Sequence, residues 1–395
     1  MKNKISILAI IIFALLNFIN CKENNMEKLE TILDTIKNSY APDKRTAIFN
    51  VKSEFKDGKV FISGETDNNE AKNELIYQLK INDLDAEIDI NVLPDKNLGD
   101  KKFGIINLSV ANLRTNPQHS AELATQSLLG TVVNVLKTEN DWFLIQTPDK
   151  YLSWVDEDGI ILVNEIEAEN WKKSEKVIVN KIYSTVYKNP SSESEMISDL
   201  VLGNVLKSID TTKEFIKIEF PDLRQGYVKF EDIQNFENWK IDTISTSEKI
   251  ISSAKNFIGI PYLWGGTSSK ALDCSGFTKT IFYMNGVILP RDASQQVNVG
   301  KQISTENNFK DLLPGDLLFF GRKETQTEKE KITHVALYIG DGKYIHSSGR
   351  VRYNSLFKES EDFNEYRFNT FIKAKRIIGN YDSKENLVKN NPFYN

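Results

Sequence analysis

The sequence predicts a multidomain α+β protein. The chain has 395 residues, whereas a single core rarely grows beyond about 250–300 residues. Helix-like and strand-like patterns alternate along the chain, and a stretch near its middle is duplicated. Apolar residues make up 40% of the chain and charged residues 27%, which is typical of globular rather than disordered protein. The net charge of −5 argues against a nucleic-acid binder.

The N-terminus carries a targeting pattern. A basic start, MKNK, precedes the apolar run ISILAIIIFALLNFIN, which is short for a membrane-spanning helix of about 20 residues. The run ends at Cys21 and the polar KENN, without an A-x-A cleavage site. It resembles a bacterial lipoprotein signal, although Asn20 stands where such signals carry Gly, Ala or Ser; an uncleaved anchor is the alternative. We expect a signal peptide over residues 1–20, lipidation of Cys21, and a lipid-anchored protein of the cell envelope, outside the cytoplasm.

A small α+β unit is expected over residues 27–96, after a polar tether over residues 21–30. MEKLETILDTIKNSY places Leu29, Ile32 and Ile36 on one face of a helix. AIFNVKSEF and KVFISGET read as strands joined by a KDG turn, NNEAKNELIYQLKIN as a second helix and AEIDINVLP as a third strand. The pattern resembles the BON-like domains of bacterial envelope proteins.

An internal repeat follows. NPQHSAELATQSLLG at residues 116–130 recurs as NPSSESEMISDLVLG at residues 189–203, which is 73 residues later. We call residues 100–166 the first repeat and residues 174–238 the second repeat. Each contains short strand-like runs separated by turn residues, which predicts two small β-barrels. They resemble the bacterial SH3-like domains of proteins that act on the cell wall.

The two repeats differ at positions of chemical interest. His119 and Tyr151 are particular to the first repeat, whereas Glu122 is shared by both. The difference indicates either ordinary drift of surface residues or a ligand-contacting role for the first repeat. The corresponding pairs are His119 with Ser192, Glu122 with Glu195, and Tyr151 with Arg224.

The last domain is expected over residues 245–380, with a C-terminal tail over residues 381–395. Ser245 and Glu248 have the spacing of a capping box at the start of a helix. PYLWGG then breaks the helical pattern, and LDCSGFTKTIFYMNG reads as a second helix that ends at Gly286. Two strands, THVALYIG and KYIHSSG, follow further along.

Cys274 lies in the first turn of that second helix. The chain holds one other cysteine, Cys21, and three histidines, too few partners for a disulfide once Cys21 is lipidated, or for a structural zinc site. Free N–H groups at a helix start stabilise a thiolate, so we expect a lowered pKa for Cys274, although Asp273 opposes this effect. The same N–H groups can stabilise an oxyanion.

Two histidines flank the predicted hairpin. If its loop is the three residues Gly-Asp-Gly, Ile339 pairs with Lys343 and Ala336 with His346. His334 and His346 then share a face of the sheet, whereas a two-residue loop would place them on opposite faces. Either histidine alone reads as structural. Together with a cysteine at a helix start, they have the composition of a cysteine hydrolase site.

The linear motifs of this domain resemble those of the NlpC-type cell-wall cysteine peptidases, which have a papain-like α+β fold. They are DCSGF, LPRDASQQ, LLPGDLLFF, THVALYIG and IHSSG, in that order, with PYLWGG before them. The resemblance implies that Cys274 is the nucleophile, His334 the base and His346 the residue that orients the base. It also implies cleft walls and a substrate site formed by Tyr262, Trp264, Asp273, Ser275, Arg291 and Asp292. For Arg291 and Asp292, a local ion pair that closes the loop after Pro290 is the alternative.

Two SH3-like domains before such a peptidase domain resemble one branch of that family. Enzymes of this branch cleave between γ-D-glutamate and a diamino acid in cell-wall peptides, and some prefer a free N-terminal L-alanine. In that branch the first SH3-like domain restricts the cleft, and Glu122 and Tyr151 are the matching residues here. The charged segment over residues 321–331 is read as a solvated loop, with a mobile flap as the alternative.

The expected protein is therefore a monomer that acts on peptidoglycan stem peptides, with a membrane anchor and without a metal, another cofactor or a nucleic-acid partner. Two other functions remain open at this point. One is an amidase or acyltransferase on the same papain-like fold, which the cysteine and histidines cannot distinguish. The other is a non-catalytic peptidoglycan-binding protein.

Overall fold

The computed structural model describes residues 25–56, 59–243 and 245–395, which divide into two compact units on either side of the Asn97–Leu98 bond. The signal segment and Cys21, for which lipidation is predicted, lie outside the described residues. Within the described ranges, no helix is both long enough and apolar enough to cross a membrane.

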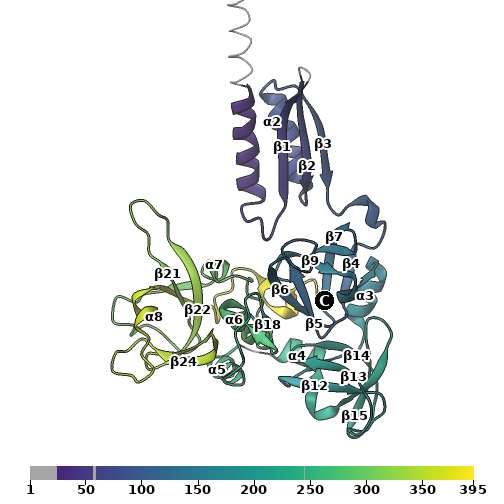
Figure 1. Cartoon of the computed structure of the whole chain (residues 1–395), viewed down its shortest axis with the longest axis vertical. Coiled ribbons are helices and arrows are strands. Elements are labelled where there is room, and N and C mark those ends of the chain that lie inside the picture. The colour runs from purple at the N-terminus through teal and green to yellow at the C-terminus, as the bar shows by residue number, and fades with distance from the viewer. Residues whose placement is uncertain (1–24, 57–58, 244) are drawn as a thin grey trace, which may run out of the picture. The chain divides into compact units, whose positions relative to one another are not determined.

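The first unit has the predicted order of helices and strands (Figure 1). A helix over residues 25–40, which takes in much of the predicted tether, is followed by β1 (Phe49–Lys56), β2 (Lys59–Thr66), α2 (Asn69–Ile81) and β3 (Ala86–Val92). The strands β1 and β2 are antiparallel, and β3 lies parallel to β2. Leu29, Ile36 and Leu75 are among the core residues that join the helices to the sheet. The resemblance to BON-like domains stays a prediction.

The two repeats form two seven-stranded antiparallel sheets with one strand order. The first repeat contains β4 (Phe103–Ile106), β5 (Val110–Arg114), β6 (Leu123–Leu128), β7 (Val132–Glu139), β8 (Trp142–Gln146), β9 (Leu152–Asp156) and β10 (Ile160–Val163). The second contains β11 (Lys176–Val179), β12 (Tyr183–Tyr187), β13 (Met196–Val201), β14 (Val205–Thr211), β15 (Phe215–Glu219), β16 (Gln225–Lys229) and β17 (Ile233–Asn235). The sheet orders are β10-β4-β7-β8-β9-β5-β6 and, read from the other edge, β17-β11-β14-β15-β16-β12-β13. Each strand begins 73 residues after its counterpart, so the duplication is confirmed.

Short helices connect these sheets to their neighbours. They are η1 (Lys96–Leu98), η2 (Glu157–Gly159), α3 (Glu165–Lys173), η3 (Phe230–Asp232) and α4 (Phe236–Asp242). The side chain of Asn164 caps α3 and that of Asn235 caps α4, each accepting a hydrogen bond from a backbone N–H of the first turn.

The C-terminal domain is built on a six-stranded antiparallel sheet of order β20-β25-β21-β22-β23-β24. One face packs against α6 through a cluster that includes Phe277, Leu337 and Ile345; the other carries a second cluster with Phe320 and Tyr344. The elements are α5 (Ser247–Lys255), β18 (Thr267–Ser268), β19 (Ala271–Leu272), α6 (Cys274–Met284), α7 (Ala293–Gln296), β20 (Lys301–Ile303), β21 (Leu317–Arg322), β22 (Lys331–Gly340), β23 (Lys343–Ser348), β24 (Arg350–Ser355), α8 (Glu365–Asn369) and β25 (Phe371–Arg376).

The predicted capping box at the start of this domain is wrong. Helix α5 begins after Thr246, whose hydroxyl accepts a hydrogen bond from the Lys249 N–H at 3.3 Å. Ser245 instead donates to the backbone oxygen of Asn285, at the end of α6. The cap lies one residue later because the Ser245 hydroxyl is used to join α5 to α6.

The C-terminal tail folds back onto the rest of the second unit. It contains η4 (Lys384–Asn386) and η5 (Val388–Asn390), and the Val388 side chain is fully buried. Asn391 donates a hydrogen bond to the Pro148 oxygen of the first repeat at 3.3 Å, and Lys240 of α4 donates to the Tyr394 oxygen at 3.1 Å. The Ile288 N–H of the C-terminal domain donates to the Asn386 backbone oxygen at 2.7 Å, so the tail ties the first repeat to the C-terminal domain.

Candidate active site

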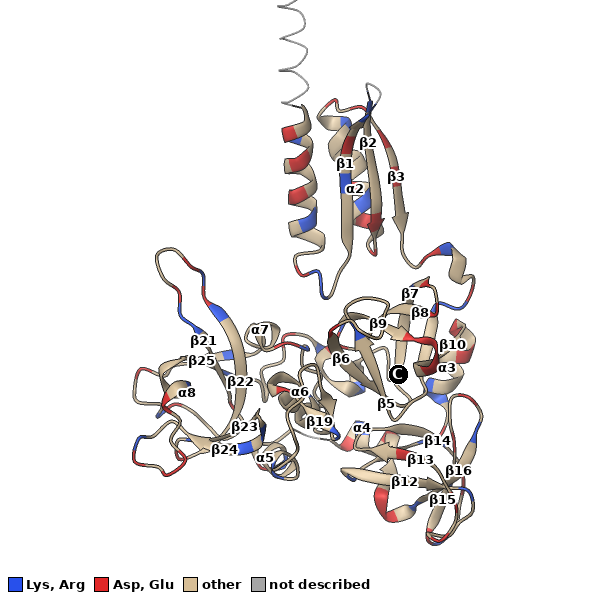
Figure 2. Cartoon of the chain, in the orientation of Figure 1, with Lys and Arg blue, Asp and Glu red and all other residues tan. Residues whose placement is uncertain are grey.

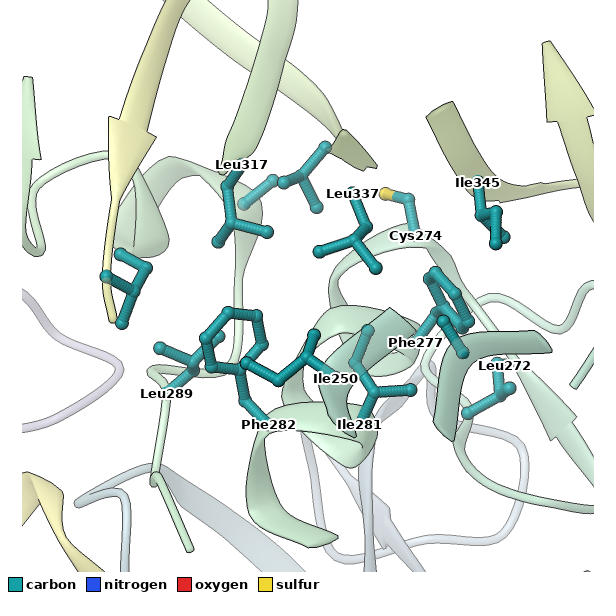
Figure 3. Close-up of a cluster of buried hydrophobic side chains, with 14 of the residues drawn as sticks. Ile250, Leu272, Cys274, Phe277, Ile281, Phe282, Leu289, Leu317, Leu337 and Ile345 are labelled. Atoms are coloured by element: carbon teal, nitrogen blue, oxygen red, sulfur yellow. The ribbon is translucent and has the colours of Figure 1, made fainter. Parts of the chain in front are cut away.

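Cys274 is the first residue of α6, where the sheet and the helix start meet (Figure 3). Asp273 is the N-cap: its carboxylate accepts hydrogen bonds from the Gly276 N–H at 2.7 Å and from the Gly265 N–H at 3.0 Å. Cys274 is 7% exposed. The backbone N–H groups of Val335 and Ser275 favour its thiolate form.

The pKa of Cys274 is raised, not lowered as the helix start alone predicted. Burial and the neighbouring Asp273 carboxylate raise the pKa of the Cys274 thiol to about 11, against the opposing effects of backbone N–H groups and of Arg291. Desolvation outweighs the helix dipole because the sulfur is almost enclosed. The cysteine is therefore held as a neutral thiol, and a base has to take its proton when it reacts.

The two histidines face each other, as predicted. Nε2 of His334 lies 2.7 Å from Nδ1 of His346, and both rings are buried. Nε2 of His346 lies 2.9 Å from Oδ1 of Asn354 on β24. Asn354 was not predicted as a site residue, because no motif marks its strand.

Asn354 fixes which ring nitrogens carry protons. Its Nδ2 donates to the Asp362 backbone oxygen at 3.0 Å, so its Oδ1 faces His346 as an acceptor. Nε2 of His346 then carries a proton, and Nδ1 of His346 accepts the one on Nε2 of His334. This leaves Nδ1 of His334 as the ring nitrogen that can take a proton from Cys274.

Burial keeps both histidines neutral. It lowers the pKa of His334 well below its ordinary value, and the adjacent His346 and the charge of Arg367 lower it further. Burial also lowers the pKa of His346 to about 3, although the hydrogen bond to Asn354 favours the charged ring. A neutral His334 is in the protonation state that a general base requires.

The hairpin that carries the histidines differs from the prediction in its loop but not in its register. Gly340 pairs with Lys343, which leaves a two-residue loop, and a bulge at Ile339 follows. The bulge shifts the pairing by one residue, so that Tyr338 lies opposite Tyr344. This is the register that the three-residue loop predicted, and it explains why the histidines meet despite the shorter loop.

Beneath the thiol, Asp273, Ser275 and Arg291 form a buried network. The Arg291 guanidinium pairs with the Asp273 carboxylate at 2.5 Å and donates to the Ser275 hydroxyl at 3.0 Å. Arg291 is 1% exposed. Arg291 therefore forms its ion pair with Asp273 rather than with its neighbour Asp292, which caps α7. The network holds the helix start and the 264–266 loop together.

The first repeat contacts the C-terminal domain through both residues that were singled out. Nε1 of Trp264 donates to Oε1 of Glu122 at 2.6 Å, and the Tyr151 hydroxyl donates to Oδ2 of Asp292 at 3.2 Å. The Trp264 side chain is 61% exposed. His119 is not part of this contact: its ring packs against Trp142, 5.0 Å away between centroids.

Other residues complete the surroundings. Burial raises the pKa of Tyr262 to about 12, and the nearby Cys274 and Asp273 raise it further. Arg367 of α8 also acts on both histidines and was missed by sequence reasoning. The segment over residues 321–331 is an exposed hairpin end with charges of both signs (Figure 2). In the described part of the chain, no three His, Cys, Asp or Glu side chains gather as metal ligands would.

Known proteins resemble the chain both in the first repeat and in the C-terminal domain. The model of the NlpC/P60 family matches residues 259–367, and that of the bacterial dipeptidyl-peptidase Sh3 domain matches residues 113–160. The gamma-D-glutamyl-L-lysine dipeptidyl-peptidase of Bacillus subtilis is 31% identical over 57% of this chain and 72% of its own length. Its namesake in Bacillus cereus is 30% identical over 57% of this chain and 67% of its own length.

Structural similarity agrees with these matches. The crystal structure of an NlpC/P60 family protein from Bacillus cereus has a TM-score of 0.60 and 25% identity, and covers 70% of this chain and 99% of its own. The matches to the C-terminal domain and to the first repeat fall on the regions where Cys274, the histidine pair, Glu122 and Tyr151 lie. The chain therefore belongs to the NlpC/P60 family, in the branch that carries bacterial SH3-like domains before the peptidase domain, and it is a peptidase.

Proposed function

We propose that the chain is a cysteine endopeptidase that hydrolyses the γ-D-glutamyl–diamino acid bond of peptidoglycan stem peptides and prefers a free N-terminal L-alanine. The observation that carries the proposal is the contact of Glu122 with Trp264. It brings a carboxylate of the first repeat to the loop that precedes Cys274. The names of the two Bacillus relatives, which specify γ-D-glutamyl-L-lysine, support the choice of bond.

The proposed chemistry starts from neutral groups. As the Cys274 sulfur attacks the γ-glutamyl carbonyl, its proton passes to Nδ1 of His334. The oxyanion that forms on the carbonyl oxygen accepts hydrogen bonds from backbone N–H groups at the start of α6. His334 then gives the proton to the leaving amine, and the C–N bond breaks. Water, deprotonated by His334, cleaves the thioester and restores the thiol.

The proposed preference for a free amine rests on Glu122. One of its carboxylate oxygens, Oε1, accepts from Trp264, and among the described residues no group bonds to Oε2. An ammonium group at this position would gain a charge-assisted hydrogen bond. A stem peptide joined to its sugar has no ammonium group there, because its alanine nitrogen is part of an amide.

The test is cleavage of L-Ala-γ-D-Glu-L-Lys and of its sugar-linked counterpart, with products identified by mass spectrometry. We expect L-Ala-D-Glu and lysine from the free peptide, and loss of turnover in Cys274→Ala. Glu122→Gln should reduce the preference for the free peptide. Equal cleavage of both substrates by the wild type would refute the free-amine role, and full activity of Cys274→Ala would refute the mechanism. Release of the intact tripeptide from the sugar-linked substrate would favour the amidase alternative.

We also propose that the enzyme is held at the cell envelope by a lipid on Cys21, with a BON-like domain and a second SH3-like domain between the anchor and the peptidase domain. The support is the order MKNK, apolar run and cysteine at the N-terminus. Incorporation of labelled palmitate in the wild type and not in Cys21→Ser is the expected result. Equal labelling of both would contradict the anchor.

A further inference from the structure

The C-terminal domain holds an arginine, Arg367, that faces the candidate active site without a carboxylate partner. It lies on α8, where its backbone N–H donates to the N-cap residue Asn364 at 3.0 Å. Among the described residues, none forms an ion pair with its guanidinium. By contrast, Arg291 and Arg376 of the same domain pair with Asp273 and Asp316.

Aromatic and polar contacts hold Arg367 beside the histidines. Its guanidinium carbon lies 5.8 Å from the centroid of the Phe320 ring, and this ring lies 5.8 Å from the ring of His334. The Asn364 side chain donates to Oδ1 of Asn354 at 3.4 Å, the atom that faces His346. Helix α8 is therefore tied to the residue that positions the histidine pair.

The charge of Arg367 is half-buried and uncompensated. Burial lowers the pKa of its guanidinium, and a thiolate at Cys274 would raise it. A partly desolvated cation without an anion is unfavourable, so its presence beside a reaction centre points to an anionic ligand. A planar guanidinium suits a carboxylate, which it can bind through two parallel hydrogen bonds.

We propose that Arg367 is a specificity-determining residue that binds the α-carboxylate of the diamino acid on the leaving side of the scissile bond. The inference rests on the proposed function. Glu122, Tyr151 and Asp292 gather on the side of the thiol where the first repeat lies, whereas Arg367 lies beside His334, which delivers the proton to the leaving amine. The carbon that bears this amine also bears a free carboxylate when the diamino acid is the last residue of the peptide. The enzyme should therefore favour tripeptides over longer stems.

Three synthetic peptides test the subsite: L-Ala-γ-D-Glu-L-Lys, the same peptide with a C-terminal carboxamide, and the same peptide with the glutamate α-carboxylate amidated. We expect the wild type to cleave the free acid with a kcat/KM about 10- to 100-fold above that of the C-terminal amide. Arg367→Gln should bring this ratio close to one by losing activity mainly on the acid, and Arg367→Lys should restore part of the ratio. On the peptide with the amidated glutamate, kcat/KM of the wild type divided by kcat/KM of Arg367→Gln should equal the value measured on the free acid.

A matched control is Lys358→Gln, which removes an exposed cation 5.7 Å from the Phe368 ring at the end of α8. Lys358→Gln should keep the wild-type ratio of kcat/KM between the free acid and the C-terminal amide. An equal loss on acid and amide in Arg367→Gln would show a structural role and overturn the subsite. If amidation of glutamate instead abolishes the effect of the substitution, the carboxylate bound is that of glutamate, which also overturns it. Cleavage of none of the peptides by the wild type would refute the proposed function itself, whereas equal cleavage of acid and amide would overturn the subsite alone.

Discussion

The buried histidine pair should make the C-terminal domain sensitive to acid. In the unfolded chain a histidine takes up a proton near its ordinary pKa of about 6.5. In the folded chain burial lowers the pKa of His346 to about 3 and lowers that of His334 well below its ordinary value. Below pH 6.5 the unfolded state therefore binds protons that the folded state does not bind. The contribution of the two neutral histidines to the free energy of unfolding is fully present above this pH and is lost as the pH falls.

The magnitude follows from the width of the pH window. Each such histidine lowers the free energy of unfolding by about 1.4 kcal/mol per pH unit between the two pKa values. For His346 alone, a change from pH 8 to pH 4.5 costs about 2.7 kcal/mol, since both pH values lie above its folded pKa of about 3. That is a large fraction of the stability of about 5–15 kcal/mol that is typical of proteins.

The comparison that isolates this effect is wild type against His346→Gln, in which one titrating group is removed and an amide remains. Urea unfolding would be followed by mass spectrometry of alkylation at Cys274, which reports on the C-terminal domain alone. At pH 8 the difference in the free energy of unfolding between the two proteins measures the packing and hydrogen bonding that the substitution removes. We expect this difference to shrink by about 1.4 kcal/mol for each pH unit below 6.5. A difference that stays constant from pH 8 to pH 4.5 would refute the reasoning.

Three further predictions concern activity and reactivity. Asn354→Leu should lower kcat about 5- to 150-fold with less change in KM, because it leaves a buried imidazole N–H without an acceptor and frees the tautomer; steady-state kinetics on the free tripeptide would show it, and an unchanged kcat would contradict the tautomer assignment. Thr115→Lys should raise KM for peptides with a free amine by up to about 5-fold, because a lysine at this position would pair with Glu122 as Lys188 pairs with Glu195 in the second repeat. An equal rise in KM for the N-acetylated peptide would argue against competition for Glu122. Alkylation of Cys274 by iodoacetamide should accelerate about tenfold per pH unit from pH 7 to pH 10, given its pKa of about 11; a plateau near pH 8 would count against a neutral resting thiol.

Sequence patterns sufficed where the chemistry is local. The helix start at Cys274, its N-cap Asp273 and the strands that carry His334 and His346 follow from short motifs, and the structure places each as expected. The same local reasoning failed for the pKa of Cys274. A helix dipole is visible in the sequence, whereas the enclosure of the sulfur by β22 depends on tertiary packing.

Residues that act across the sheet were beyond sequence reasoning. Asn354 meets His346 because β23 pairs with β24, and Arg367 approaches His334 because α8 follows that edge strand. Neither residue has a periodic or motif signal of its own. The bulge at Ile339 is a further case, because the alternation of side chains does not reveal where a strand gains a residue.

The duplication shows how the two repeats differ in the partners of their carboxylates. In the second repeat Glu195 pairs with Lys188 at 2.9 Å, but the residue equivalent to Lys188 in the first repeat is Thr115. Glu122 therefore lacks a cation within its own repeat and bonds to Trp264 of the C-terminal domain. Asp222 and Asp149 show the same change: Asp222 pairs with Arg224 inside its repeat, whereas Asp149 pairs with Lys279 of α6 at 2.6 Å. Two positions that carry cations in the second repeat, Lys188 and Arg224, are Thr115 and Tyr151 in the first repeat, and the corresponding carboxylates, Glu122 and Asp149, bond instead to Trp264 and Lys279 of the C-terminal domain.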